Sequence, residues 1–301
     1  MAVVLLNREV LKMSQTFILY NPLAGCGAHQ NAVDNLAQNY DNAIKYDITK
    51  GIDFTELFAG ITDDDTVILC GGDGTLNRFA NDTRGIALPK NLFYFADGTG
   101  NDFLRDIGVE ASSLIDIRKY IEDLPTVTIN GKEYSFINGV GFGIDGYCCE
   151  VGDKQRAEGK TNINYALIAI KGLLFHYKPT KATVTVDGQS YEFDKVWIAP
   201  TMNGRFYGGG MMPTPEQDRL REDGKLSLLI FHGTGKLRTL SIFPSLFEGK
   251  HVNHTKNIAI LEGDEITVKF DRPVSLQIDG ETHLGITEYS AKSRAKNRIT
   301  V

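Results

Sequence analysis

The feature that most constrains this chain is a glycine-rich turn, Gly71-Gly72-Asp73-Gly74-Thr75, directly after the β-branched apolar run 66–70. The run predicts a strand, and the glycines with the threonine predict a tight turn that leads into a helix N-terminus. Without Cβ atoms, the backbone N–H groups of such a turn can approach a phosphate, and the helix dipole favours the negative charge. Asp73 would repel a bare phosphate, so we expect a divalent cation between them. The turn therefore predicts a nucleotide site.

Composition and charge limit the classes of function. The chain has 301 residues, of which 42% are hydrophobic and 23% charged, and its net charge is -6. These values fit an ordinary globular protein long enough for two domains. Proteins that bind nucleic acid need clustered cations, so the acidic balance argues against nucleic acid as a partner.

The cysteines and the apolar segments bear on the cellular compartment. Cys26, Cys70, Cys148 and Cys149 have neither metal-ligand spacing nor a disulfide pattern, which predicts reduced cysteines and a cytoplasmic protein. The longest apolar stretch, 166–175, is interrupted by a lysine and is too short to cross a bilayer. No secretory signal is apparent, and we expect residues 1–12 to be an extension before the first domain.

Strand and helix signals alternate in residues 14–125. The runs 16–20, 66–70 and 92–95 are typical of buried strands, and apolar residues at helical spacing predict a helix over 114–121. This order predicts an α/β domain with a mostly parallel sheet, whose loops gather at the carboxyl ends of the strands.

The pattern changes in residues 126–285. Asn130-Gly131 and Asp187-Gly188 are hairpin signals between short alternating segments, and further strand-like segments follow up to residue 278. We interpret this region as a second domain, a mainly antiparallel β-sandwich.

Three loops of the first domain share one design, since each follows an apolar strand and contains glycine. They are residues 21–25, 71–75 and 97–102. In an open parallel sheet such loops converge at one edge, where ligands bind. Hydroxyl, amide and carboxylate groups come from Thr75, Thr99, Asn101 and Asp102. Together the loops predict a phosphate site.

This ordered set of motifs resembles the soluble diacylglycerol kinase catalytic family, which includes sphingosine kinases, ceramide kinases and bacterial soluble lipid kinases. The resemblance covers nearly the whole chain from Thr16, and its motifs are Asn21-Pro22 with Gly25, the 71–75 turn, Gly98-Thr99-Gly100-Asn101-Asp102, Gly208-Gly209-Gly210, Asp223-Gly224 and Asp279-Gly280-Glu281. NAD kinases share the glycine turn and phosphofructokinases have a similar one, so the resemblance implies a first domain with their kind of parallel sheet. It also implies that residues 286–301 return to that domain.

The resemblance implies a role for each matched position of the nucleotide site. ATP and its Mg²⁺ would be bound by Asn21, Pro22, Gly25, Gly71, Gly72, Asp73, Gly74, Thr75, Asn77, Gly98, Thr99, Asn101 and Asp102. Asp73 would belong to the Mg²⁺ network and so has a catalytic role. Two residues before Gly98 depart from the family pattern, Ala96 and Asp97, and an extra carboxylate near the phosphates costs affinity unless it joins the metal shell.

The resemblance also assigns the proton transfer. Glu281 matches the general base that takes the proton from the lipid hydroxyl, and Asp279 would orient that site. The residues themselves point the same way, since 275–278 predicts a strand whose Asp-Gly turn leaves Glu281 at an open end. An ordinary hairpin turn with solvated acids is the alternative interpretation.

A second metal position is implied at Leu220, Asp223 and Lys225, with Leu220 and Lys225 contributing backbone carbonyls. The segment 210–223, which contains Leu220 and Asp223, is longer than usual and carries several charges, which bears against this site.

The hypothesis is an ATP- and Mg²⁺-dependent kinase of a neutral-lipid hydroxyl, with diacylglycerol as the first choice and phosphatidate as the product. The enzyme would be cytoplasmic and would visit the membrane surface transiently. A homodimer is one of the oligomeric states left open. Tyr147, 165–175, Phe206-Tyr207 and Met211-Met212 are candidates for an acyl-chain cleft or for ordinary core. Two alternatives remain open: an NAD kinase-like enzyme, and an inactive nucleotide-binding regulator.

Overall fold

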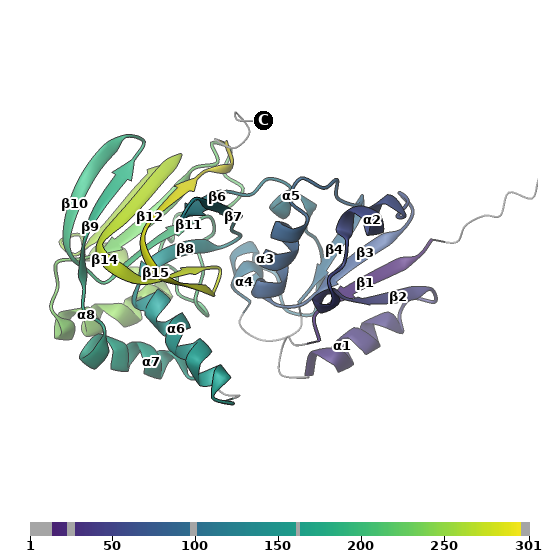
Figure 1. Cartoon of the computed structure of the whole chain (residues 1–301), viewed down its shortest axis with the longest axis horizontal. Coiled ribbons are helices and arrows are strands. Elements are labelled where there is room, and N and C mark those ends of the chain that lie inside the picture. Colours follow the sequence, from purple (N-terminus) through teal and green to yellow (C-terminus); the bar gives the residue numbers. More distant parts are fainter. Residues whose placement is uncertain (1–13, 23–27, 97–100, 161–162, 296–301) are drawn as a thin grey trace, which may run out of the picture.

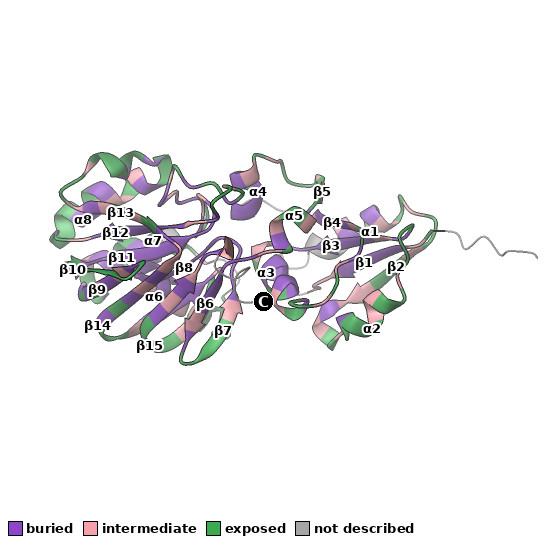
Figure 2. Ribbon diagram, turned by 90° about the horizontal axis from the view of Figure 1, so that it is seen from above, coloured by how far each residue is buried: buried purple, intermediate pink, exposed green. Residues whose placement is uncertain are grey.

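A parallel α/β domain and an antiparallel β domain lie side by side along the long axis of the molecule (Figure 1). The computed structural model describes residues 14–22, 28–96, 101–160 and 163–295. Buried residues follow the strands of both domains (Figure 2), so each domain has its own core.

The first domain is built on a five-stranded sheet in the order β2-β1-β3-β4-β5. Its strands are β1 (Thr16–Tyr20), β2 (Ala43–Asp47), β3 (Thr66–Cys70), β4 (Asn91–Phe95) and β5 (Leu114–Asp116). β1 to β4 are parallel, and β5 is antiparallel to β4. Along β3, Val67 and Leu69 enter one core and Ile68 the other, so the strand is buried on both faces.

The helices of the first domain are α1 (Ala28–Ala37), η2 (Ile48–Lys50), α2 (Phe54–Ala59), α3 (Asp73–Asp82), α4 (Asp102–Ile107) and α5 (Arg118–Ile121). Residues 114–121 differ from the predicted helix, because residues 114–116 extend the sheet as β5 and only α5 is helical. The apolar spacing of this short segment fits either structure, and pairing with β4 decides between them.

The second domain is an antiparallel sheet in the order β13-β12-β11-β8-β14-β15-β6-β7, with β9 between β14 and β10. Its strands are β6 (Thr126–Ile129), β7 (Lys132–Ser135), β8 (Gly139–Gly143), β9 (Thr180–Val186), β10 (Gln189–Val196), β11 (Ile198–Met202), β12 (Leu226–Phe231), β13 (Ile258–Gly263), β14 (Glu265–Ile278) and β15 (Glu281–Lys292). The predicted combination of a parallel α/β domain with an antiparallel β-sandwich is confirmed.

The long strand β14 explains how this sheet closes into a sandwich. Its first half pairs with β9, from Ile266 to Phe270, and its last three residues pair with β8. The register with β15 shifts between Lys269 and Val274, so the strand is irregular between the two halves. Strands that change partners across a bulge form the corners of sandwiches, and β14 has this arrangement.

The helices of the second domain lie along one side of its sheet, where α6, α7 and α8 are grouped (Figure 1). They are α6 (Ile144–Ala157), α7 (Tyr165–Lys171), the π-helical turn η3 (Gly172–His176), α8 (Lys236–Ile242), η4 (Phe243–Glu248) and η5 (Lys250–Asn253). Between them and the strands lies a separate core that includes Trp197 and Leu246. Among the helices of the described residues, none is both long and apolar enough to span a membrane.

The segment after residue 285 differs from its expected position. Residues 286–292 continue β15, which pairs with β14 and, through Ser290 and Lys292, with β6 of the second sheet. Ile286, Tyr289 and Ala291 are buried in the sandwich core, and this burial holds the segment in the second domain. Residues 296–301 lie outside the described residues.

Candidate active site

The three glycine-containing loops leave the first sheet at one edge. Tyr20, Cys70 and Phe95 are aligned in register as the last residues of β1, β3 and β4. Asn21 and Pro22 directly follow the first of these strands, and the 71–75 turn follows the second. The structure thus brings together the described parts of the predicted loops. Gly25, Asp97, Gly98 and Thr99 lie outside the described residues.

The glycine turn is shaped by close packing against its own helix. A Cβ atom on Gly71 would come within 2.4 Å of the Thr75 side chain, so only glycine fits there. α3 begins at Asp73, and its N-cap residue Gly72 provides no side-chain hydrogen bond. The first backbone N–H groups of α3 are therefore free of a side-chain cap at the end where the helix dipole favours an anion.

Asn101 and Tyr94 connect the third loop to the glycine turn. Asn101 is the N-cap of α4, and its Oδ1 accepts a hydrogen bond from the Leu104 N–H at 2.8 Å. Its Nδ2 donates to the Tyr94 hydroxyl at 2.7 Å, and that hydroxyl donates to the Gly71 carbonyl at 2.8 Å. This chain of bonds holds the α3 and α4 N-termini next to one another.

Carboxylates from both domains gather at this point. Asp73 accepts hydrogen bonds from the N–H groups of Asp102, at 2.7 Å, and Phe103, at 3.3 Å. Burial, together with the charges of Asp102 and Asp279, raises the pKa of Asp73 to about 7. Burial also raises the pKa of Asp102, whose Oδ2 accepts the Gly209 N–H at 2.8 Å. The buried Oδ1 of Asp102 has no hydrogen-bond partner among the described residues.

Asp279 joins the two domains at the tip of the β14–β15 hairpin. Its φ of 45° and the 90° of Gly280 fit the two-residue type I′ turn that Asp-Gly favours. The Asp279 carboxylate accepts the Asn77 amide of α3 at 2.7 Å. It also accepts three backbone N–H groups, from Ile137 and Asn138 between β7 and β8 and from Gly139 at the start of β8.

Glu281 starts β15 directly after this turn, opposite Ile278, and its side chain is exposed. It therefore stands two residues from a direct contact with α3, at the domain junction. The amide of Asn77, expected at the nucleotide, is used instead at this junction, because it also donates to the Ser135 carbonyl at 3.3 Å.

A second junction, which the sequence analysis missed, centres on Asp106 of α4. The Arg219 guanidinium donates to its Oδ2, and Arg205 donates to its Oδ1 from both Nε, at 2.9 Å, and the backbone, at 3.0 Å. Burial alone would raise the pKa of Asp106, but the two arginines lower it. Arg219 also reaches Asn138 Oδ1 at 3.0 Å. The signal in the sequence that could have pointed to Asp106 is its place four residues after Asp102 on the same helix.

The proposed second metal position has other partners. Arg221 binds both carboxylate oxygens of Asp223, at 2.6 and 3.1 Å. The Lys225 carbonyl accepts the Gln217 amide at 3.0 Å, and the Leu220 side chain is partly exposed. Across residues 14–22, 28–96, 101–160 and 163–295, no three acidic, histidine or cysteine side chains are grouped to hold a metal ion. The Arg221 guanidinium thus occupies the carboxylate that the predicted second metal position would use.

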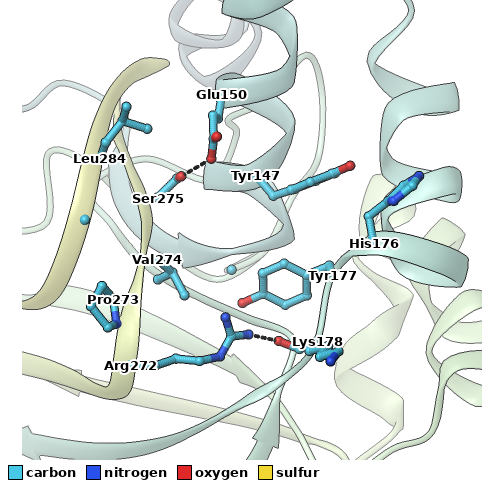
Figure 3. A pocket seen from close by; sticks show the side chains of 12 residues that line it. Tyr147, Glu150, His176, Tyr177, Lys178, Arg272, Pro273, Val274, Ser275 and Leu284 are labelled. Carbon is cyan, nitrogen blue, oxygen red and sulfur yellow. Dashed lines mark hydrogen bonds between the residues drawn. The ribbon is translucent and has the colours of Figure 1, made fainter.

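The second domain contains a cavity of about 390 Å³ between α6, the segment after η3 and the β14–β15 hairpin (Figure 3). Glu150 and Ser275 are hydrogen-bonded on one side of it, and Arg272 donates to the Lys178 carbonyl on another. Tyr147, Tyr177 and Leu284 also line it. Of the residues predicted for a lipid cleft, Tyr147 lies here, while Tyr207 and Met211 are buried in the core.

Comparisons with known proteins agree with this architecture. The model of the diacylglycerol kinase catalytic domain matches residues 15–129, and the model of the YegS C-terminal NAD kinase beta sandwich-like domain matches residues 138–292. A diacylglycerol kinase of Mycobacterium tuberculosis is 25% identical over 284 residues, covering 87% of this chain and 84% of the relative. One of Bacillus subtilis is 23% identical over 282 residues, covering 89% and 90%.

A solved structure supports the fold. The crystal structure of a diacylglycerol kinase from Bacillus anthracis superposes with a TM-score of 0.57 at 19% identity, covering 94% of this chain and 96% of that one. Both halves of the chain thus match a family model, and relatives align over most of its length. The chain belongs to the diacylglycerol kinase-like lipid kinase family and is a kinase of that family.

Proposed function

We propose that this protein transfers the γ-phosphoryl group of ATP to the hydroxyl of a neutral lipid, with diacylglycerol as the substrate and phosphatidate as the product. The observation that carries the proposal is the Asn77–Asp279 hydrogen bond, because it ties the hairpin that bears Glu281 to the helix that follows the glycine turn. The relatives named above as diacylglycerol kinases support the choice of lipid.

The nucleotide would lie at the loop edge of the first sheet. The uncapped N-terminus of α3 would supply backbone donors for its phosphates, and Asn21 and Pro22 after β1 would lie beside them. Asn101 holds α4 in place, and Asp73 and Asp102 provide carboxylates beside the phosphates. The expected contacts of Gly25, Gly98 and Thr99 remain part of this proposal.

The acidic cluster fits one Mg²⁺ ion bound together with the nucleotide. Asp102 keeps a buried oxygen without a hydrogen-bond partner in the described residues. The pKa of Asp73 is raised mainly by burial and further by the charges of Asp102 and Asp279, which a cation would offset. Mg²⁺ is commonly held by one or two carboxylates plus substrate phosphates, so the lack of a three-residue group is compatible with it. When bound, the ion would neutralise charge on the transferring phosphoryl group.

Glu281 would act as the general base. Its carboxylate would accept the proton of the lipid hydroxyl while that oxygen forms a bond to the γ-phosphorus and the bond to ADP breaks. Asp279 would act as a positioning residue, since its carboxylate is committed to the turn and to Asn77. The exposure of Glu281 leaves it accessible to a substrate at the junction.

The cavity beside β15 is the proposed lipid site. Leu284, which lines it, lies three residues after Glu281 on the same strand. Mixed polar and aromatic lining from Tyr147, Tyr177 and Arg272 suits the ester and glycerol region of a lipid, with apolar contacts at Leu284 and Val274. We further propose a cytoplasmic enzyme that meets this substrate at a membrane surface.

Transfer of radiolabelled γ-phosphate to a panel of lipids tests the proposal. We expect labelled phosphatidate from diacylglycerol and no labelled NADP from NAD. Phosphorylation of NAD alone would point to the NAD kinase-like alternative, and ATP binding without transfer to any acceptor would point to an inactive regulator.

A further inference from the structure

The outer side of α7 and η3 is apolar and uncovered. Ile168 and Leu173 point into the core between the helices and the strands. On the other side, Leu167 is 46% exposed, Ile170 43% and Phe175 72%. Leu167 and Ile170 are three residues apart on one face of α7, and Phe175 extends this outward strip on the π-helical turn η3 that follows. Single exposed apolar residues are ordinary, but a strip that repeats on one face of a helix indicates a contact surface.

The start of α8 extends this strip. Lys236 Nζ donates to the Leu174 carbonyl at 2.6 Å, which places α8 against η3. The next residue, Leu237, is 79% exposed, more than any other large apolar side chain in the described part of the chain. α7 and α8 lie on the same side of the second sheet (Figure 1).

The charge of these segments is opposite to that of the whole protein. Residues 159–181 and 233–247 contain no Asp or Glu, although the net charge of the chain is -6. Their exposed cations near the strip are Lys171, Lys178, Lys236 and Arg238. Where the structure describes the chain, none of these four forms an ion pair, so their positive charge is not neutralised locally.

We propose that this surface docks on a bilayer that contains anionic phospholipids. The docking face is defined as Leu167, Ile170, Lys171, Phe175, Lys178, Lys236, Leu237 and Arg238. The cations would lie at the headgroups, and the apolar side chains would enter the boundary with the acyl chains. The inference rests on the proposed function, because it names the surface through which a membrane-embedded substrate would be reached.

The face leads directly to the cavity. Lys178 belongs to both, and the cavity extends from there to Leu284 on the strand that begins at Glu281. A lipid that leaves the bilayer at the docking face would therefore reach the cavity, one wall of which lies three residues from the proposed base along β15. This order of surfaces supports a membrane as the occupant.

Flotation with lipid vesicles tests the docking face. We expect the wild-type protein to float with vesicles of phosphatidylcholine mixed with phosphatidylglycerol, and less with phosphatidylcholine alone or at high salt. Phe175→Ser combined with Leu237→Ser should lower the partition coefficient about tenfold or more. Lys171→Glu combined with Arg238→Glu should lower it about fivefold or more per cation.

Matched controls lie in the first domain. Leu114 on β5 is 42% exposed, and Lys119 on α5 is exposed and forms no ion pair with the described residues. Leu114→Ser and Lys119→Glu should float as the wild type does. If the variants of the docking face bind mixed vesicles as well as the wild type, the inference is wrong.

Two further measurements separate this inference from the proposed function. A short-chain diacylglycerol dispersed in solution should be phosphorylated equally by the wild type and by both face variants. No phosphorylation of any lipid by the wild type would refute the proposed function, while the vesicle binding would still be decided by flotation. The last measurement is the oligomeric state by sedimentation. If the wild type is a dimer, and Phe175→Ser with Leu237→Ser converts it to monomers without changing flotation, the face is a contact between two copies. That result would overturn the membrane assignment.

Discussion

The amide of Asn77 and the carboxylate of Asp279 are 2.7 Å apart, although 202 residues separate them in the sequence. The first belongs to the helix after the glycine turn and the second to the hairpin of the other domain. The bond places Glu281 at the junction of the two domains, and Glu281 itself needs no contact with the first domain.

Replacing Asn77 with alanine tests this relationship. Asn77→Ala removes one donor to Asp279, and loss of a hydrogen bond to a charged group costs about 1.5–3 kcal/mol. We expect kcat to fall by about tenfold to a hundredfold, because the hairpin loses its link to α3, while the Kd for ATP changes little. Asn81→Ala, which removes hydrogen bonds to the Ser135 backbone and to Asn77 but none to Asp279, is the comparison. Equal kcat values for Asn77→Ala and the wild type would contradict the positioning role.

Glu281→Gln tests the proposed base directly. The side chain is exposed, so the melting temperature should stay close to that of the wild type. Turnover should fall by about 10²–10⁴-fold, because a neutral amide cannot accept the proton, and calorimetry should show ATP binding intact. Glu288→Gln on the same strand is the control and should keep full activity. Normal turnover by Glu281→Gln would remove Glu281 from the mechanism.

The raised pKa of Asp73 predicts a pH dependence of stability without nucleotide. Because its folded-state pKa is about 7, above the ordinary value of 3.8, the folded protein binds a proton more tightly than the unfolded chain. The stabilisation from this site is therefore full at acid pH and is lost as the pH rises toward 7. Asp73→Asn should flatten the fall in the free energy of unfolding between about pH 4 and 7. Parallel curves for the two proteins over this range would show that Asp73 titrates normally.

The buried Asp106–Arg219 pair predicts a large effect on stability. Both side chains are less than 5% exposed, at 3% and 4%, and removing one partner of a buried pair typically costs about 3–5 kcal/mol. Arg219→Gln should lower the free energy of unfolding by that amount in urea denaturation. Arg205 is 39% exposed, so Arg205→Gln should cost clearly less. If both substitutions cost the same small amount, the junction does not depend on the buried pair.

The contacts of Asp223 predict that its loop does not bind Mg²⁺. Since Arg221 already holds both oxygens of Asp223, Mg²⁺ should gain no ligand there. Asp223→Asn should therefore leave any Mg²⁺-dependent rise in melting temperature unchanged. A rise that is present in the wild type and lost in Asp223→Asn would place a cation in this loop.

Local patterns in the sequence were enough for the architecture and for the loop edge. The glycine turn follows a β-branched strand, and the strand-helix alternation predicts the parallel sheet that aligns Tyr20, Cys70 and Phe95. Where two structures share one apolar spacing, as in residues 114–121, the sequence could not decide, because pairing with β4 settles the outcome. The prediction that residues 286–292 return to the first domain was wrong. It followed the family resemblance, whereas burial of Tyr289 holds this segment in the sandwich core.

Contacts between the domains could not be derived from local pattern. Asp106 and Arg219 are 113 residues apart, and neither flanking sequence shows periodicity that pairs them. The function of Asn77 at the junction was missed for the same reason, since its partner lies in the other domain. Such pairs follow from how the two domains dock, which no short window of sequence encodes.

The bulge of β14 lines the cavity, and the end of the same strand carries the turn before Glu281. Under the proposed function, the acceptor lipid and its base would therefore both lie on this hairpin, and the phosphate donor would lie on the other domain. A change in the distance between the domains would then leave the acceptor hydroxyl and its base in the same relative positions.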